Sequence, residues 1–199
     1  MKILAFVDVH GDKKCIENII KKSRDVDVLV CAGDLTTFGL SLNKVFDEII
    51  KTNKEFLFIH GNHEESFEDL GLLKSIKNKN FTYLHRNFYI KEDYVFIGYG
   101  GGGFSQEDKE MERFFDKIYS KIDMSKKIIL VTHAPPFKTR VDFLPHLGYR
   151  GNKSINRVIK KFKPVLLICG HLHETAGVTD RIGETLIINP GSKGKIIEI

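Results

Sequence analysis

The sequence contains no tryptophan, few cysteines and prolines, and no long apolar run. Its 3 cysteines cannot all pair and form no CxxC motif, which excludes a scaffold held together by disulfides. A transmembrane helix needs about 20 apolar residues, whereas apolar runs such as Ile3–Val7 and Val165–Cys169 have only the length of a strand. The first acidic residue, Asp8, comes too early for a secretory signal. We therefore expect a cytoplasmic protein with no membrane association.

A strong excess of one charge is also absent. The chain has 31 Lys and Arg against 26 Asp and Glu, a formal net charge of +5. Its lysines are scattered, and the densest cluster, at Lys160, Lys161 and Lys163, is typical of a solvated helix face. We therefore expect no specific nucleic-acid motif. The length of 199 residues and the 42% hydrophobic content fit one globular domain over residues 1–199.

Six short apolar runs predict β-strands, and helical patterns lie between them. The predicted strands are Lys2–Val7, Val26–Cys31, Glu55–His60, Tyr94–Gly98, Lys127–Val131 and Pro164–Cys169. The predicted helices are Asp12–Ser23, Ser41–Thr52, Glu64–Ile76, Gln106–Ile122 and Lys153–Phe162. Because the first three strands alternate with helices, they favour βαβ units and a parallel sheet.

Several shorter segments bounded by turn residues predict further strands. They are Phe81–Tyr83, Asn87–Lys91, Ala176–Ile182, Thr185–Asn189 and Lys193–Ile199. Their spacing is typical of hairpins, so we expect a largely antiparallel set. A parallel set and an antiparallel set together suggest two sheets with helices on the outside.

Polar side chains follow five of the six main strands directly. They are Asp8 and His10, Asp34, Asn62 and His63, His133, and His171 and His173. Ligands bind at the carboxyl ends of strands in open α/β sheets, so these side chains are expected at one edge. Imidazole, carboxylate and amide oxygen without cysteine suit manganese, iron, zinc, nickel or cobalt. Even with His63 left aside, seven such groups are too many for one ion with open positions, but they fit two ions that share a carboxylate.

These ordered blocks resemble the calcineurin-like metallophosphoesterases. The blocks are Asp8-x-His10, Gly33-Asp34, Gly61-Asn62-His63-Glu64, His133 and Gly170-His171-x-His173. Three stretches are most similar to the small Icc-related phosphoesterases: Gly33-Asp34-Leu35-Thr36, His133-Ala134-Pro135-Pro136 and Asn189-Pro190-Gly191-Ser192. The resemblance implies an α/β fold, a four-layer αββα sandwich of two mixed β-sheets flanked by helices.

The resemblance also implies a role for each residue of the blocks. Asp8, His10, Asp34 and His173 would hold a first metal ion, and Asp34, Asn62, His133 and His171 a second, with Asp34 as the bridge. Manganese is the first expectation, with nickel, cobalt, iron or zinc as alternatives. His63 would stand beside the scissile phosphate as general acid while a metal-bridging hydroxide attacks phosphorus. The implied function is a phosphodiesterase for a small phosphate ester, with nucleotide-derived esters among the candidates.

The chain departs from the protein Ser/Thr phosphatase branch of this family, which carries GDxxDRG. The sequence here is Gly33-Asp34-Leu35-Thr36-Thr37-Phe38-Gly39. Thr37 stands where that branch has the Asp that orients the catalytic histidine, so the orienting partner of His63 stays open. The Arg of that motif is missing. The alternatives are a phosphomonoesterase of the same family and, further behind, a non-catalytic interaction scaffold on the same fold.

Weaker signals lie outside these blocks. Lys138, Arg140 and Arg150 follow His133 and could clamp a substrate phosphate, the alternative being solvated loop charges. The run Gly98–Gly103 formally matches GxGxxG, but its place in the chain argues against a dinucleotide site. We expect its glycines to allow a tight turn or a close backbone approach to the metal site. The remaining candidates, His85 and His146, are expected at the surface.

Overall fold

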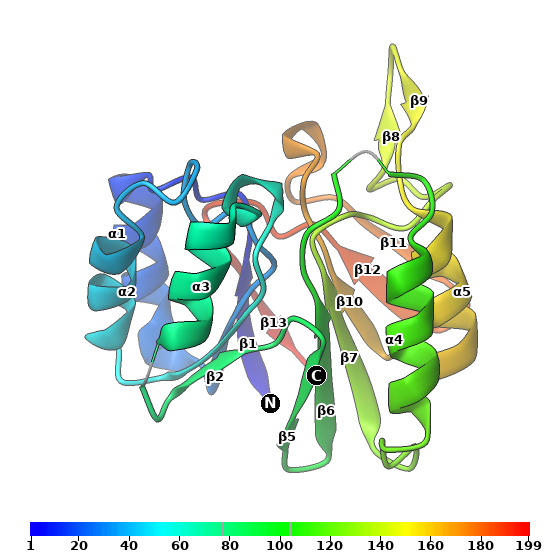
Figure 1. Ribbon diagram of the computed structural model, residues 1–199, viewed down its shortest axis with the longest axis horizontal. Helices are drawn as coiled ribbons and strands as arrows, with labels where there is room; N and C mark the ends of the chain where they lie inside the picture. Colours follow the sequence, from blue (N-terminus) through cyan, green and yellow to red (C-terminus); the bar gives the residue numbers. More distant parts are fainter. Residues whose placement is uncertain (77, 104) are drawn as a thin grey trace.

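Two β-sheets lie face to face at the centre of the computed structural model, which describes residues 1–76, 78–103 and 105–199 (Figure 1). For residues 67–69 only the backbone is described. The first sheet contains β1 (Lys2–Phe6), β2 (Val28–Cys31), β3 (Glu55–Phe58), β4 (Phe81–Tyr83) and β13 (Lys195–Glu198). Their order is β13-β1-β2-β3-β4, with β13 antiparallel to β1 and all other pairs parallel.

The second sheet has a parallel centre and antiparallel edges. It contains β5 (Asn87–Lys91), β6 (Tyr94–Tyr99), β7 (Lys127–Thr132), β10 (Leu166–Ile168), β11 (Thr179–Ile182) and β12 (Thr185–Ile188). Their order is β11-β12-β10-β7-β6-β5, and only β11 and β5 run antiparallel to their neighbours. A separate hairpin of β8 (Phe143–Leu144) and β9 (Gly148–Tyr149) projects from the end of the molecule (Figure 1).

Helices cover the outer face of each sheet (Figure 1). They are α1 (Lys13–Lys22), α2 (Leu42–Ile50) and α3 (Phe67–Ser75) on the first sheet, and α4 (Lys109–Tyr119) and α5 (Lys153–Phe162) on the second. Three short 3₁₀ turns complete the structure: η1 (Ser23–Asp25), η2 (Asn62–Glu64) and η3 (His173–Thr175). None of the described helices has the length and apolar content that crossing a bilayer requires.

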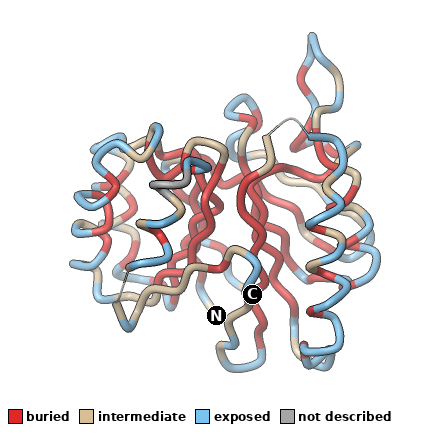
Figure 2. Tube along the Cα trace, in the orientation of Figure 1, coloured by how far each residue is buried: buried red, intermediate tan, exposed pale blue. Residues whose placement is uncertain are grey.

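Apolar side chains fill the three spaces between these four layers and form three packed cores. Along β1, Ile3 and Ala5 belong to the core between the sheets, whereas Leu4 and Phe6 belong to the core under α1 and α2. This alternation follows from the two-residue period of a strand. Buried residues accordingly concentrate in the strands, and exposed residues lie on the outer helix faces (Figure 2). The predicted αββα sandwich of two mixed sheets is confirmed.

The predicted antiparallel set is confirmed for the hairpin of β11 and β12 and wrong in several other pairings. β4 adds in parallel to β3, β12 lies in parallel beside β10, and β13 joins the other sheet instead of forming a hairpin with β12. Long-range burial decides the last case, because Ile197 of β13 packs into the core between the sheets. The helix predicted from Glu64 starts only at Phe67, since Asn62–Glu64 forms a separate 3₁₀ turn.

Candidate metal centre

The polar residues predicted at the strand ends meet at one end of the two sheets. They follow β1, β2, β3, β7 and β10, whose carboxyl ends point to the same side (Figure 1). Four of these residues adopt left-handed backbone angles that non-glycine residues rarely take: Asp8, His10, Asp34 and His171. Such conformations cluster at functional sites, where the surrounding structure holds the strain. Here they turn the chain sharply just as each strand ends.

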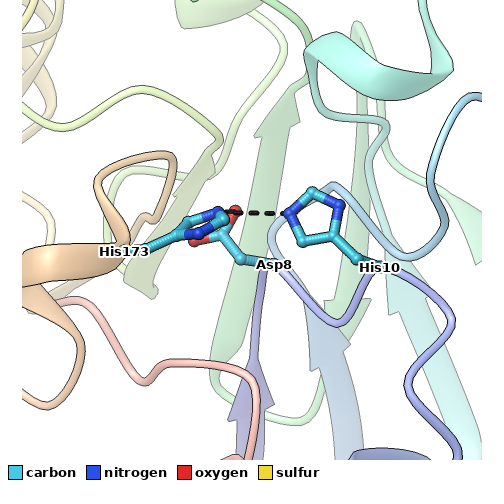
Figure 3. Close-up of side chains that lie close together, drawn as sticks. All are labelled: Asp8, His10 and His173. Carbon is cyan, nitrogen blue, oxygen red and sulfur yellow. Dashed lines mark hydrogen bonds and ion pairs between the residues drawn. The ribbon is translucent and has the colours of Figure 1, made fainter.

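A first ligand group consists of Asp8, His10 and His173 (Figure 3). The Nε2 atoms of His10 and His173 are 3.1 Å apart, and the Nε2 atom of His173 lies 3.9 Å from Oδ1 of Asp8. Two nitrogens bound to one ion at about 2.1 Å lie about 3.0–3.4 Å apart in octahedral or tetrahedral coordination. These three side chains therefore fit a single metal ion.

A second group gathers around Asn62. Its Oδ1 atom is 3.0 Å from Nε2 of His133 and 2.9 Å from Nδ1 of His171. The other ring nitrogen of His133 lies 3.0 Å from the carbonyl oxygen of Ala32, which can only accept a hydrogen bond. In neutral His133 the proton therefore sits on Nδ1, and Nε2 faces the Asn62 oxygen as a second acceptor. Two acceptors at this distance fit a shared cation, and a backbone partner of this kind is typical of metal-binding histidines.

Asp34 lies between the two groups. Its Oδ2 atom is 3.9 Å from Nε2 of His10 and 3.4 Å from Nε2 of His133, and its Oδ1 atom accepts a hydrogen bond from the backbone N–H of His63. Burial by itself would raise the pKa of Asp34. In the metal-free protein, however, Asp34 raises the pKa of His133, and a protonated His133 donates a hydrogen bond and adds a charge that lower the pKa of Asp34 below its ordinary value. Asp34 is thus a carboxylate that could be shared by two ions.

The ring of His63 lies beside these groups and contacts other rings. Its centroid is 4.7 Å from that of His10 and 4.6 Å from that of Phe38. Its Nδ1 atom is buried and finds no hydrogen-bond partner among the described residues. The carboxylate that orients the histidine in the protein phosphatase branch has no counterpart in these contacts. A ring nitrogen of His63 also lies within 4.8 Å of ligand atoms of His10 and Asp34, so its exclusion from the ligand set stays a prediction.

Two buried side chains, Glu64 and Asn189, hold the loops of this centre in place. Neither was assigned a role from the sequence. Glu64 accepts hydrogen bonds from the N–H and hydroxyl of Thr36 and from the N–H of Gly61, which ties together the loops after β2 and β3. Asn189 donates to the carbonyl of Leu172 and to the Thr175 hydroxyl, which fixes the turn between His171 and η3. Their signals in the sequence were their places inside the GNHE and NPGS blocks.

Replacing Glu64 should test this tie between the loops. Glu64→Ala is expected to lower the free energy of unfolding by about 2–4 kcal/mol, because each buried donor left without a partner costs about 1–3 kcal/mol. Urea denaturation of the metal-free protein measures the change. The control is Glu17→Ala on the exposed face of α1, which should shift stability by less than about 0.5 kcal/mol. A loss no larger than that of the control would contradict the assigned role.

Glycines allow backbone to approach the centre closely. A Cβ atom on Gly61 would collide with the Asp34 carboxylate, and one on Gly33 would lie 2.8 Å from Nδ1 of His133. In the glycine run, a Cβ atom on Gly100 would lie 2.6 Å from His60, and one on Gly103 would lie 3.6 Å from His171. Gly103 thus lies beside His171, where a Cβ atom would make only an ordinary contact, and the positive φ angles of Gly101 and Gly102 fit the alternative of a tight turn.

His85 differs from its predicted surface position. It is half-buried, with its ring 4.5 Å from that of His60, and it accepts a hydrogen bond from the N–H of Gly100. Burial lowers the pKa of His85 to about 4, so this imidazole is neutral at pH 7. The glycine run packs close to His85 and covers it. The residues next to His85 in the sequence do not indicate this burial. His146 is exposed, as predicted.

The predicted phosphate clamp gains no direct support. Arg140 is exposed, and its backbone N–H donates to Asp180; the backbone N–H of Arg150 donates to the carbonyl of Asp142. None of the contacts described for either arginine reaches one of the seven ligand residues. Substrate binding by Arg140 and Arg150 stays a prediction.

Comparison with known proteins identifies a family and a shared fold. The family model for calcineurin-like phosphoesterases matches residues 1–175. The protein MJ1162 of Methanocaldococcus jannaschii is 31% identical, over 99% of this chain and 91% of its own length. Among solved structures, TT1561 of Thermus thermophilus has a TM-score of 0.79 at 16% identity, covering 96% of this chain and 90% of its own. A novel archaeal phosphodiesterase has a TM-score of 0.55 at 20% identity, with coverages of 96% and 84%. At these identities the solved structures establish a shared fold.

Proposed function

The chain belongs to the calcineurin-like phosphoesterase family, and we propose that it is a phosphodiesterase that works with two divalent transition-metal ions. Membership of this family indicates a hydrolase of phosphate esters. The observation that carries the proposal of two ions is the place of Asp34, whose Oδ2 atom lies within 4 Å of a histidine from each ligand group. Manganese is the first metal to test, since the oxygen and imidazole ligands suit it.

In this proposal the side chains divide the work. Bound metal ions would supply an activated water and offset charge on the phosphoryl oxygens. Asp34 would hold both ions at a fixed separation, while Asn62 and His133 would keep the second ion buried. His63 would stabilise charge beside the phosphate and give a proton to the leaving oxygen. His173 has a side chain that is 59% exposed, which leaves the first ligand group accessible to a small substrate from solvent.

The lack of a positive charge at the position of Phe38, next to His63, favours a diester over a monoester. A monoester carries up to two negative charges and a diester only one, so a monoesterase gains more from an extra cation at the phosphate. In the protein phosphatase branch that position is Arg, whereas this chain has Phe38, with its ring against His63.

Hydrolysis of two chromogenic substrates tests the proposal. With Mn²⁺ we expect turnover of bis(p-nitrophenyl) phosphate at a kcat/KM at least about tenfold above that of p-nitrophenyl phosphate, which corresponds to about 1.4 kcal/mol of transition-state discrimination. Dialysis against a chelator should abolish the activity, and added Mn²⁺ should restore it. A preference for the monoester would identify a phosphomonoesterase. No turnover of either ester with Mn²⁺, Ni²⁺ or Co²⁺ would favour a non-catalytic scaffold.

A further inference from the structure

Two large apolar side chains are exposed in the loop that follows the candidate ligand Asp34. Phe38 is 69% exposed and Leu40 is 68% exposed, the two highest values among the exposed large apolar residues that the structure describes. Both lie in the loop between β2 and α2, and we call the pair the apolar platform. Exposed apolar surface can mark an interaction site when it lies at a functional centre. Of the two residues, Phe38 is the one with a described contact there, through the ring of His63.

The loop holds the platform in place. Thr36 is fully buried and bound twice to Glu64, and the hydroxyl of Thr37 donates to the backbone carbonyl of His10. The backbone N–H of Leu40 then donates to the carbonyl of Thr37. Phe38 itself has a φ of 50°, a left-handed conformation that is uncommon for a bulky residue. Because Thr36 and Thr37 are tied to site residues and Leu40 closes a turn back onto Thr37, the loop around the exposed Phe38 is held by hydrogen bonds.

Phe38 lies against the histidine that the proposed mechanism assigns to the leaving group. The ring centroids of Phe38 and His63 are 4.6 Å apart, with an angle of 32° between the planes, so one side of the phenyl ring covers the imidazole. Most of the remaining ring surface is open to solvent. A group that receives a proton from His63 must therefore leave next to Phe38.

We propose that the apolar platform binds an aromatic or similarly planar apolar ring carried by the leaving alcohol of the substrate. This inference rests on the proposed function, because it takes His63 as the residue at the leaving oxygen. The platform has no charged group, so it would not select a charged leaving group. An aromatic ring favours offset stacking with another planar ring, which gives selectivity for planar groups over small alkyl groups.

The inference is tested by the binding of two diesters, one that carries phenyl rings and one that carries none. Isothermal titration calorimetry with the Mn²⁺-loaded protein would compare dibenzyl phosphate with dimethyl phosphate, which carry the same charge. We expect Phe38→Ala to weaken the binding of dibenzyl phosphate about 3- to 10-fold, the range for loss of one aromatic pair. The binding of dimethyl phosphate should weaken less than about 2-fold. Phe38→Tyr should retain the wild-type affinities. The control Ile90→Ala, at an exposed apolar residue of β5, should change neither Kd.

Several results would overturn the inference. Equal weakening of both diesters by Phe38→Ala would indicate a general effect on the site. A lower kcat for bis(p-nitrophenyl) phosphate with unchanged affinity for dibenzyl phosphate would mean that Phe38 only positions His63. If dibenzyl phosphate bound wild-type protein no more tightly than dimethyl phosphate, the platform would have no role in substrate binding. Failure of the proposed function would be seen separately, as absence of turnover. The affinities are measured by binding and do not depend on turnover.

Discussion

Asp34→Asn is expected to reduce the metal content from about two ions per chain to one or fewer and to lower kcat/KM about 10³-fold or more. The physical reason is that Oδ2 of Asp34 faces both His10 and His133, so loss of its charge weakens both ligand groups at once. Loss of even a residue that only orients a ligand costs about 10- to 100-fold in metal affinity, and a shared ligand should cost more. Elemental analysis and hydrolysis of bis(p-nitrophenyl) phosphate measure the two effects.

The asparagine keeps the shape of Asp34 and can still accept the hydrogen bond from the backbone N–H of His63, so the fold should survive. A matched control is Asp47→Asn on the exposed face of α2, which should retain both ions and the full rate. Near-normal metal content and rate in Asp34→Asn would show that Asp34 is not the bridge. A single tightly held ion in the wild-type protein, even with excess Mn²⁺, would contradict the proposal of two ions.

The sequence located the candidate ligands because of a simple rule of sheet geometry. Parallel strands of one sheet end at the same edge, so the polar residues after β1, β2 and β3 share one edge and those after β7 and β10 share another. The two edges meet because the sheets pack with these strand ends on the same side (Figure 1), which the rule alone does not predict. Pairing of the shorter strands could not be predicted in the same way. Whether β13 joins β1 or β12 depends on where Ile197 is buried, which is a contact with residues far away in the sequence.

Glu64 and Asn189 stood inside the GNHE and NPGS blocks, but the contacts through which they position the candidate ligands could not be predicted from the sequence. The bonds of Glu64 to Thr36 connect residues 28 apart in the sequence, and no local pattern predicts such a pair. The same holds for Phe38, whose neighbour His63 lies on a different loop. A spacing pattern identifies which residues share an edge of the sheet, but contacts between loops require the folded chain.

His63→Gln is expected to lower the rate about 10²- to 10⁴-fold for an ester with an alkyl leaving group, the usual contribution of a general acid. Metal content should stay unchanged, because Asn62, which precedes it, supplies the ligand atom, and the backbone N–H of residue 63 still donates to Asp34. The rate comparison uses a nucleoside 2′,3′-cyclic phosphate for the alkyl leaving group and bis(p-nitrophenyl) phosphate for a good one. Asp47→Asn again serves as the control for protein quality.

The two substrates separate the possible roles of His63. p-Nitrophenolate departs without a proton, so the loss of rate should be smaller with bis(p-nitrophenyl) phosphate than with the cyclic ester. Some loss should remain even there, since a protonated imidazole also stabilises charge on the transferring phosphoryl group. An equal loss with both substrates would leave His63 an electrostatic group with no acid role. If His63→Gln removed a metal ion, the closeness of its ring to His10 and Asp34 would instead make His63 a ligand.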